Sequence, residues 1–98
     1  MVIVSGFNVY PREVEEVLHS HPAIAEAAVI GRPDPVRGEA LAAFIVLRAA
    51  LTAESLRAWL AEQLTRYKLP TDLLFVDALP RTGVGKIDKA ALATRLKG

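Results

Sequence analysis

The chain has 98 residues, of which 52% are hydrophobic and 23% charged, and this composition is typical of one globular domain with a modest core. Twelve basic residues nearly balance eleven acidic ones, for a formal net charge of +1, and they are spread along the chain, which argues against a nucleic-acid-binding surface. The absence of cysteine excludes disulfides and thiolate chemistry, and no apolar run is long enough to span a membrane, so we expect a cytoplasmic, soluble domain.

Two short apolar runs open the chain and predict a β-hairpin. The first covers residues 1–4 and the second covers residues 7–10, and Ser5 and Gly6 lie between them. Because glycine adopts the backbone conformations that tight turns require, we expect the hairpin to turn at Gly6.

A helix is predicted directly after this hairpin, from Pro11 to about Ser20. Proline is tolerated at a first helical position, and Val14, Val17 and Leu18 fall on one face of the helix.

The middle of the chain predicts two strands and the longest helix. Residues 27–30 indicate a buried strand, the stretch GRPDPVRG at residues 31–38 a turn, and residues 40–47 a longer strand. Thr52 can cap the helix that follows, and Pro70 ends that segment. The apolar stripe of this helix consists of Leu56, Trp59, Leu60 and Leu64. Residues 73–76 then indicate another buried strand.

The stretch LPRTGVGKID, residues 79–88, places a lysine between a glycine and an isoleucine. Asp88 can cap a last helix, with Ile87 and Leu92 spaced as a hydrophobic staple, so Lys86 lies two residues outside that helix. The elements together predict an α+β fold, in which about three helices cover a small mixed sheet with an N-terminal hairpin.

A lysine beside glycines first suggests a phosphate-binding loop, because glycines let backbone amides approach an anion. The Walker pattern is not met, since Pro80 occupies the position of its first glycine and Ile87 that of its hydroxyl residue. An exposed loop lysine with no special task is the alternative.

Three stretches carry a resemblance to one known family. They are SGFNVYPREVEEVL near the start, GRPDPVRGEALAAFIVL in the middle, and YKLP followed by LPRTGVGKID near the end. In order and spacing they resemble the C-terminal domain of the AMP-forming acyl-CoA synthetases, in the adenylate-forming ligase superfamily. The resemblance covers essentially the whole chain, residues 1–98, and SGFNVYP is most similar to the fatty acyl-CoA ligases.

The resemblance implies a two-step reaction carried by two domains. A large N-terminal domain, which this chain does not include, binds ATP with Mg and a carboxylic acid, expected here to be a fatty acid. The C-terminal domain closes over it to form an acyl-adenylate, then rotates so that coenzyme A can attack. Lys86 matches the family's adenylation lysine, with Gly83 and Gly85 supporting its loop, and Ser5-Gly6-Phe7 matches the segment that faces the pantetheine arm.

The same resemblance makes this chain a lid that needs its own N-terminal domain as partner. We expect neither ATP nor coenzyme A to bind tightly to the domain alone, and the isolated domain to be inactive. The family's hinge residue falls just before the segment that begins this chain, so we expect an excised or separately produced domain. A free-standing α+β binding or regulatory module without ligase activity is the alternative.

Several other polar or aromatic residues predict no chemistry. His19 and His21 lie at the end of the first predicted helix without a third or fourth ligand nearby, so no metal site is expected. The remaining residues are expected to cap backbone, face solvent, end a helix or join the core, and they are Asp34, Arg37, Glu39, Lys68 and Trp59.

Overall fold

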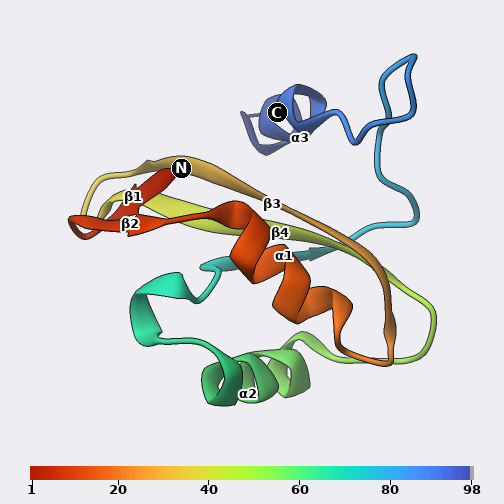
Figure 1. Cartoon of the computed structure of the whole chain (residues 1–98), viewed down its shortest axis with the longest axis horizontal. Helices are drawn as coiled ribbons and strands as arrows, with labels where there is room; N and C mark the ends of the chain where they lie inside the picture. Colours follow the sequence, from red (N-terminus) through yellow and green to blue (C-terminus); the bar gives the residue numbers. More distant parts are fainter. Residues whose placement is uncertain (98) are drawn as a thin grey trace.

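Five strands form one sheet, and helices cover both of its faces (Figure 1). The computed structural model describes residues 1–97. The elements in chain order are β1 (Val2–Val4), β2 (Phe7–Val9), α1 (Pro11–His19), β3 (Ile24–Asp34), β4 (Gly38–Leu47), α2 (Ala53–Gln63), the short 3₁₀ helix η1 (Arg66–Lys68), β5 (Asp72–Phe75) and α3 (Lys89–Lys97). The predicted α+β class, with an N-terminal hairpin and three α-helices, is confirmed.

Strand β4 is the centre of the sheet. It pairs antiparallel with β3 along nearly its whole length, from Ile24 opposite Leu47 to Asp34 opposite Gly38. On its other side β4 meets β1 at one end and β5 farther along, and β5 runs parallel to it. The sheet is therefore mixed, as predicted.

The core has two layers because β4 is buried on both faces. Alternate β4 residues point to opposite sides, so Leu41 and Ile45 join one apolar cluster and Phe44 joins the other. The first cluster lies beneath α1 and α2, and the second is completed by α3 through Leu92. Burial on both faces explains why residues 40–45 are an unbroken apolar run.

The turn between β3 and β4 is shorter than predicted. The turn was expected at residues 31–38 and the strand before it at residues 27–30, but β3 runs from Ile24 to Asp34 and β4 begins at Gly38. Only residues 35–37 lie between the two strands. The glycine and proline residues in this stretch suggested a loop, and cross-strand pairing overrides that local preference.

Pro33 fits within β3 because one edge of this strand is not paired with another strand in the described part of the chain. The amides of Ala27 and Val29 point to that edge and donate to His19 Nε2 (3.2 Å) and Glu15 Oε2 (2.8 Å) on α1. Pro33 has the same parity along the strand, so its missing N–H removes no hydrogen bond to β4.

The starts of the three predicted helices are confirmed, but the second helix ends at Gln63 and does not continue through Leu64 towards Pro70 as predicted. Helix α1 begins at Pro11, and α2, the longest α-helix described in residues 1–97, begins after Thr52, whose Oγ1 accepts the Ser55 N–H (3.1 Å). Helix α3 follows Asp88, whose Oδ1 accepts the Ala91 N–H (3.0 Å). The short helix η1 was not predicted. The chain is extended at Leu64, and η1 that follows it has only three residues, Arg66–Lys68.

Strand β5 begins one residue earlier than predicted and is only partly buried, so the expectation of a buried strand was wrong. It pairs with β4 alone among the described strands, which leaves its other edge open. Leu73 packs against the first cluster and Leu74 against the second.

Candidate functional site

Lys86 follows a tight three-residue loop that projects from the body of the domain, in the blue segment before α3 in Figure 1. The Thr82 N–H donates to the Lys86 carbonyl (2.7 Å), and the Gly85 N–H donates to the Thr82 carbonyl (2.9 Å). Arg81 and Ile87 form a β-bridge one step farther out. The chain thus forms a miniature hairpin whose loop is residues 83–85.

Gly85 carries the conformational requirement of this loop. Its φ is +85°, a left-handed conformation that glycine adopts without a steric penalty, at the last loop position of such hairpins. The φ of Gly83 lies outside the left-handed region, and a Cβ built there would meet nothing within 4 Å. Of the two glycines expected to support the lysine, Gly85 is therefore the one that the backbone requires.

The Lys86 side chain is exposed, and its ammonium group makes no hydrogen bond or ion pair with residues 1–97. Its neighbours differ in this respect. Arg81 pairs with Glu26 of β3, and Lys89 Nζ pairs with Glu15 Oε2 of α1 at 2.8 Å. The geometry leaves the Lys86 charge available to a group outside this domain.

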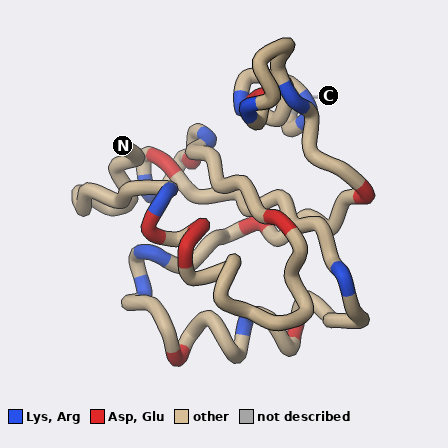
Figure 2. The backbone as a smooth tube through the Cα atoms, turned by 45° about the vertical axis from the view of Figure 1, so that its right-hand side comes forward, with Lys and Arg blue, Asp and Glu red and all other residues tan. Residues whose placement is uncertain are grey.

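The C-terminal segment around this loop is electropositive. From residue 79 to residue 97 the chain carries five basic residues against one acidic residue, and the basic ones are Arg81, Lys86, Lys89, Arg95 and Lys97. Figure 2 shows basic residues gathered on α3 and the loop before it, while both signs are interspersed over the rest of the domain. This end of the molecule favours an anionic partner.

The second candidate segment, Ser5-Gly6-Phe7, forms the predicted turn of the β1–β2 hairpin. Ser5 has a φ of 51° and Gly6 a φ of +84°, so both residues of the two-residue turn are left-handed. This is the turn geometry that matches the twist of paired strands, and it places Val4 opposite Phe7. The Ser5 N–H donates to the Arg37 carbonyl (2.9 Å), which fixes the turn to the β3–β4 connection.

Phe7 is held by the 3₁₀ helix η1. The residue is 52% exposed, and its ring stacks on Tyr67, with ring centroids 4.3 Å apart and planes 14° from parallel. The next residue, Lys68, donates from Nζ to Glu13 Oε1 of α1 (2.7 Å), and this hydrogen bond raises the pKa of Lys68. Lys68 was expected only to end a helix, and its pairing with α1 was not predicted.

The structure does not bring the two candidate segments together. In Figure 1 the β1–β2 turn lies at one end of the sheet, and the Lys86 loop lies beyond the opposite side, past α3. A partner at a single position could not meet both segments without a change in the orientation of the domain.

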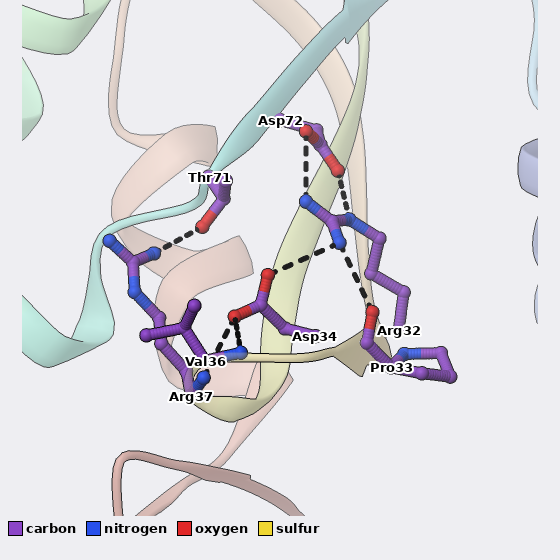
Figure 3. Close-up of polar contacts among 7 residues, drawn as sticks. All are labelled: Arg32, Pro33, Asp34, Val36, Arg37, Thr71 and Asp72. Atoms are coloured by element: carbon purple, nitrogen blue, oxygen red, sulfur yellow. Dashed lines mark hydrogen bonds and ion pairs between the residues drawn. The ribbon is translucent and has the colours of Figure 1, made fainter.

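A polar network that the sequence did not signal ties the β3–β4 turn to β5 (Figure 3). Arg32 Nε donates to Asp72 Oδ2, and Arg32 Nη2 donates to Asp72 Oδ1 at 3.4 Å. The hydrogen bond to Asp72 raises the pKa of Arg32. Arg37 Nη1 donates to Thr71 Oγ1 at 2.7 Å, so two bridges span the same gap.

Asp34 organises the turn itself and was expected to do no more than that. Its Oδ2 accepts the N–H groups of Arg37 (2.8 Å) and Val36 (3.2 Å), which is the backbone capping that the sequence indicated. These hydrogen bonds, the one from Arg37 foremost, lower the pKa of Asp34. Glu39 has a similar role, since its Oε1 accepts the Ile3 N–H (3.0 Å).

The two histidines accept backbone hydrogen bonds. His19 Nε2 accepts the Ala27 N–H, and His21 Nδ1 accepts the Ala23 N–H at 3.0 Å. The His21 ring also meets Trp59 edge-on, and Trp59 packs against the first core cluster as expected. Residues 1–97 contain no group of three or more His, Cys, Asp or Glu side chains placed to hold a metal ion.

Comparison with known proteins identifies the family. The family model described as the AMP-binding enzyme C-terminal domain matches residues 13–86, which is most of the chain and runs up to the lysine at the end of the loop. The chain belongs to this family.

Curated relatives match this C-terminal domain over nearly its whole length. A long-chain-fatty-acid–CoA ligase of Escherichia coli O6:H1 is 44% identical over 99 residues, which is 100% of this chain and 18% of the relative. The medium/long-chain-fatty-acid–CoA ligase FadD8 of Mycobacterium tuberculosis is 42% identical and matches 97% of this chain. The domain thus spans about a fifth of the length of these relatives.

Solved structures share the fold. A fatty acyl CoA synthetase of Mycobacterium tuberculosis superposes with a TM-score of 0.88 at 39% identity, covering 95% of this chain and 19% of that chain. The amide bond synthetase McbA of Marinactinospora thermotolerans superposes with a TM-score of 0.89 at 41% identity, covering 96% of this chain and 19% of that chain. Within residues 1–97, no helix has the length and apolar character that crossing a membrane requires.

Proposed function

We propose that this domain is the mobile C-terminal lid of an AMP-forming fatty acid–CoA ligase, and that Lys86 serves acyl-adenylate formation. The main observation behind the proposal is that Lys86 is exposed at the end of a tight, projecting loop. A required left-handed glycine ends a tight loop, and the exposed ammonium that follows has no partner within residues 1–97. A lysine that served only solubility would need no such loop.

The chemistry of the first half-reaction calls for such a group. Attack of a carboxylate on the α-phosphate of ATP brings two anions together and increases the charge on the transferred centre. An ammonium placed there stabilises both partners, and Mg bound with ATP shares that task. The electropositive C-terminal segment supports an approach to ATP by this end of the domain.

The β1–β2 turn suits the second half-reaction. Gly6 presents bare backbone, and a Cβ built on it would meet nothing within 4 Å, so the turn faces open space that a slim chain can enter. We propose that Ser5-Gly6-Phe7 lines the path of the pantetheine arm of coenzyme A. Phe7, which stacks on Tyr67, would place a fixed apolar side chain beside that arm.

The separation of the two segments supports a two-orientation reaction. One orientation would place Lys86 over the adenylate site, and a rotated one would place the hairpin beside the thiol. The proposal of a fatty acid as substrate is supported by the names of the curated relatives. A cytoplasmic location accompanies it, because ATP and coenzyme A are the co-substrates.

The test is to assay the two half-reactions separately in the full-length enzyme. We expect Lys86→Ala to slow acyl-adenylate formation about a hundred- to thousandfold, the usual effect of losing one preorganised charge contact. Transfer from a supplied acyl-adenylate to coenzyme A should stay within about threefold of wild type. Lys86→Arg should restore adenylation only in part, because a planar guanidinium does not replace a point charge.

Lys89→Ala is the matched control, since Lys89 lies three residues farther on and is already paired with Glu15. It should leave both half-reactions within about twofold, because the Lys89 charge is already paired with Glu15 inside the domain. Adenylation by Lys86→Ala within a few-fold of wild type, or equal damage to both steps, would contradict the proposal.

A further inference from the structure

The geometry points to Arg81 and Glu26 as positioning residues for Lys86, an inference that rests on the function proposed above. Arg81 Nη1 donates to the carbonyl of Gly85 (3.1 Å), and its Nη2 pairs with Glu26 Oε1 of β3. Gly85 directly precedes Lys86, so one guanidinium links the peptide that leads into the lysine to the central sheet.

No other polar side-chain contact in the described structure joins this loop to the sheet. The remaining hydrogen bonds of residues 80–88 close the loop on itself or start α3, and they hold its shape but not its direction. Leu79 and Ile87 anchor its base in the second apolar cluster. The direction of the projecting tip is therefore set by the contact between Arg81 and Glu26.

Glu26 is a firm anchor for this contact. It pairs with Val46 of β4 beside the irregularity between Ile24 and Glu26, and the β3 residues that follow it, Ala27 to Ile30, are buried. Arg81 is suited to link two acceptors, because its planar fork donates in two directions at once. The sheet thus provides the fixed position, and Arg81 links the loop to it.

Because the contact between Arg81 and Glu26 is exposed, its loss should change the position of Lys86 without unfolding the domain. The side chains of Arg81 and Glu26 are 44% and 38% exposed, and ion pairs of this kind contribute little to global stability. Removing Arg81 should therefore leave the fold intact. It should release the Lys86 ammonium from its productive position, and small misplacements of a catalytic group reduce rates strongly.

The experiment uses the full-length enzyme and the two separated half-reactions. We expect Arg81→Ala to lower kcat for adenylation about tenfold or more, with the KM values for ATP and the acid within about twofold, because Arg81 is not proposed to touch either substrate. Thioester formation from supplied acyl-adenylate should stay within about twofold. Arg12→Ala is the matched control, because Arg12 is an arginine of α1 whose side chain is 86% exposed and which lies outside the electropositive segment, and it should leave both steps unchanged.

A double variant tests whether Arg81 acts through Lys86. In a Lys86→Ala background, Arg81→Ala should cause no further loss of adenylation, because there is no longer an ammonium to position. Glu26→Gln should cause a smaller loss than Arg81→Ala, since the Gly85 contact survives, and Arg81→Lys should recover part of the rate.

Three outcomes would overturn the inference. They are wild-type adenylation by Arg81→Ala, additive losses in the double variant, and equal losses in both half-reactions for Arg81→Ala and Glu26→Gln. These outcomes differ from a failure of the proposed function, in which Lys86→Ala itself would adenylate normally.

Discussion

Gly85 determines how the loop turns into Lys86, and the two glycines beside this lysine give a matched pair. An L-residue in the left-handed conformation of Gly85 costs about 1–2 kcal/mol, whereas Gly83 has no such conformation. We expect Gly85→Ala to lower the free energy of unfolding by about 1–2 kcal/mol and to slow adenylation. Gly83→Ala should change the unfolding free energy by less than about 0.5 kcal/mol, or stabilise slightly. Denaturant titration measures both, and equal effects would contradict the distinction.

Asp34 makes stability depend on pH at the acidic end. Its pKa is lowered from the ordinary value of 3.8, first by the hydrogen bond from the Arg37 N–H. A lowered folded-state pKa means that the carboxylate stabilises the fold above about pH 3.8 and loses this effect as the pH falls through the folded-state pKa. The difference in unfolding free energy between wild type and Asp34→Asn should therefore shrink below that pH. A difference that stays constant into strong acid would contradict the role of the charge.

At the scale of elements, the β1–β2 hairpin offers a test of the second half-reaction. In the full-length enzyme, Gly6→Leu should slow thioester formation more than adenylation, because its bulk obstructs the thiol only in the rotated orientation. Leucine is also strained at a φ of +84°, so Gly6→Asn is the control, since asparagine tolerates this conformation better. Equal losses of both half-reactions in Gly6→Leu, matched by Gly6→Asn, would assign the glycine to folding alone.

The relation between α1 and β3 shows how one element protects another. The outward amides of Ala27 and Val29 are taken up by His19 and Glu15, so α1 covers part of an edge that could otherwise pair with a second chain. Glu15 also pairs with Lys89, which links α1 to the start of α3. The helix α1 thus contacts both β3 and the first residue of α3.

At the scale of the whole molecule, the domain has two apolar clusters, one on each face of the sheet, and β4 contributes residues to both. We expect the isolated chain to unfold cooperatively in a denaturant titration, because the two clusters are packed against the same central strand. The same folded chain should show no pyrophosphate exchange with ATP and fatty acid, since Lys86 alone cannot bind the phosphates of ATP and the sequence has no Walker pattern. The full-length enzyme is the positive control, and clear turnover by the chain alone would contradict the lid proposal.

Local sequence determined most of the elements of this domain, because their signals act within a few residues. Pro11, the Thr52 cap and the Asp88 cap each placed a helix start correctly, and the Ser5-Gly6 pair placed the first turn. The spacing of three motifs was likewise sufficient to indicate the family and to single out Lys86.

Tertiary structure alone decided the features that depend on partners far along the chain. Residues 31–34 became strand only because β4 pairs with them, and Pro33 fits there only because its N–H would face the open edge. Arg32 meets Asp72, and Arg81 meets Glu26, across 40 and 55 residues of sequence. Such contacts leave no periodic or local signal, because they form only after the sheet has brought distant segments together.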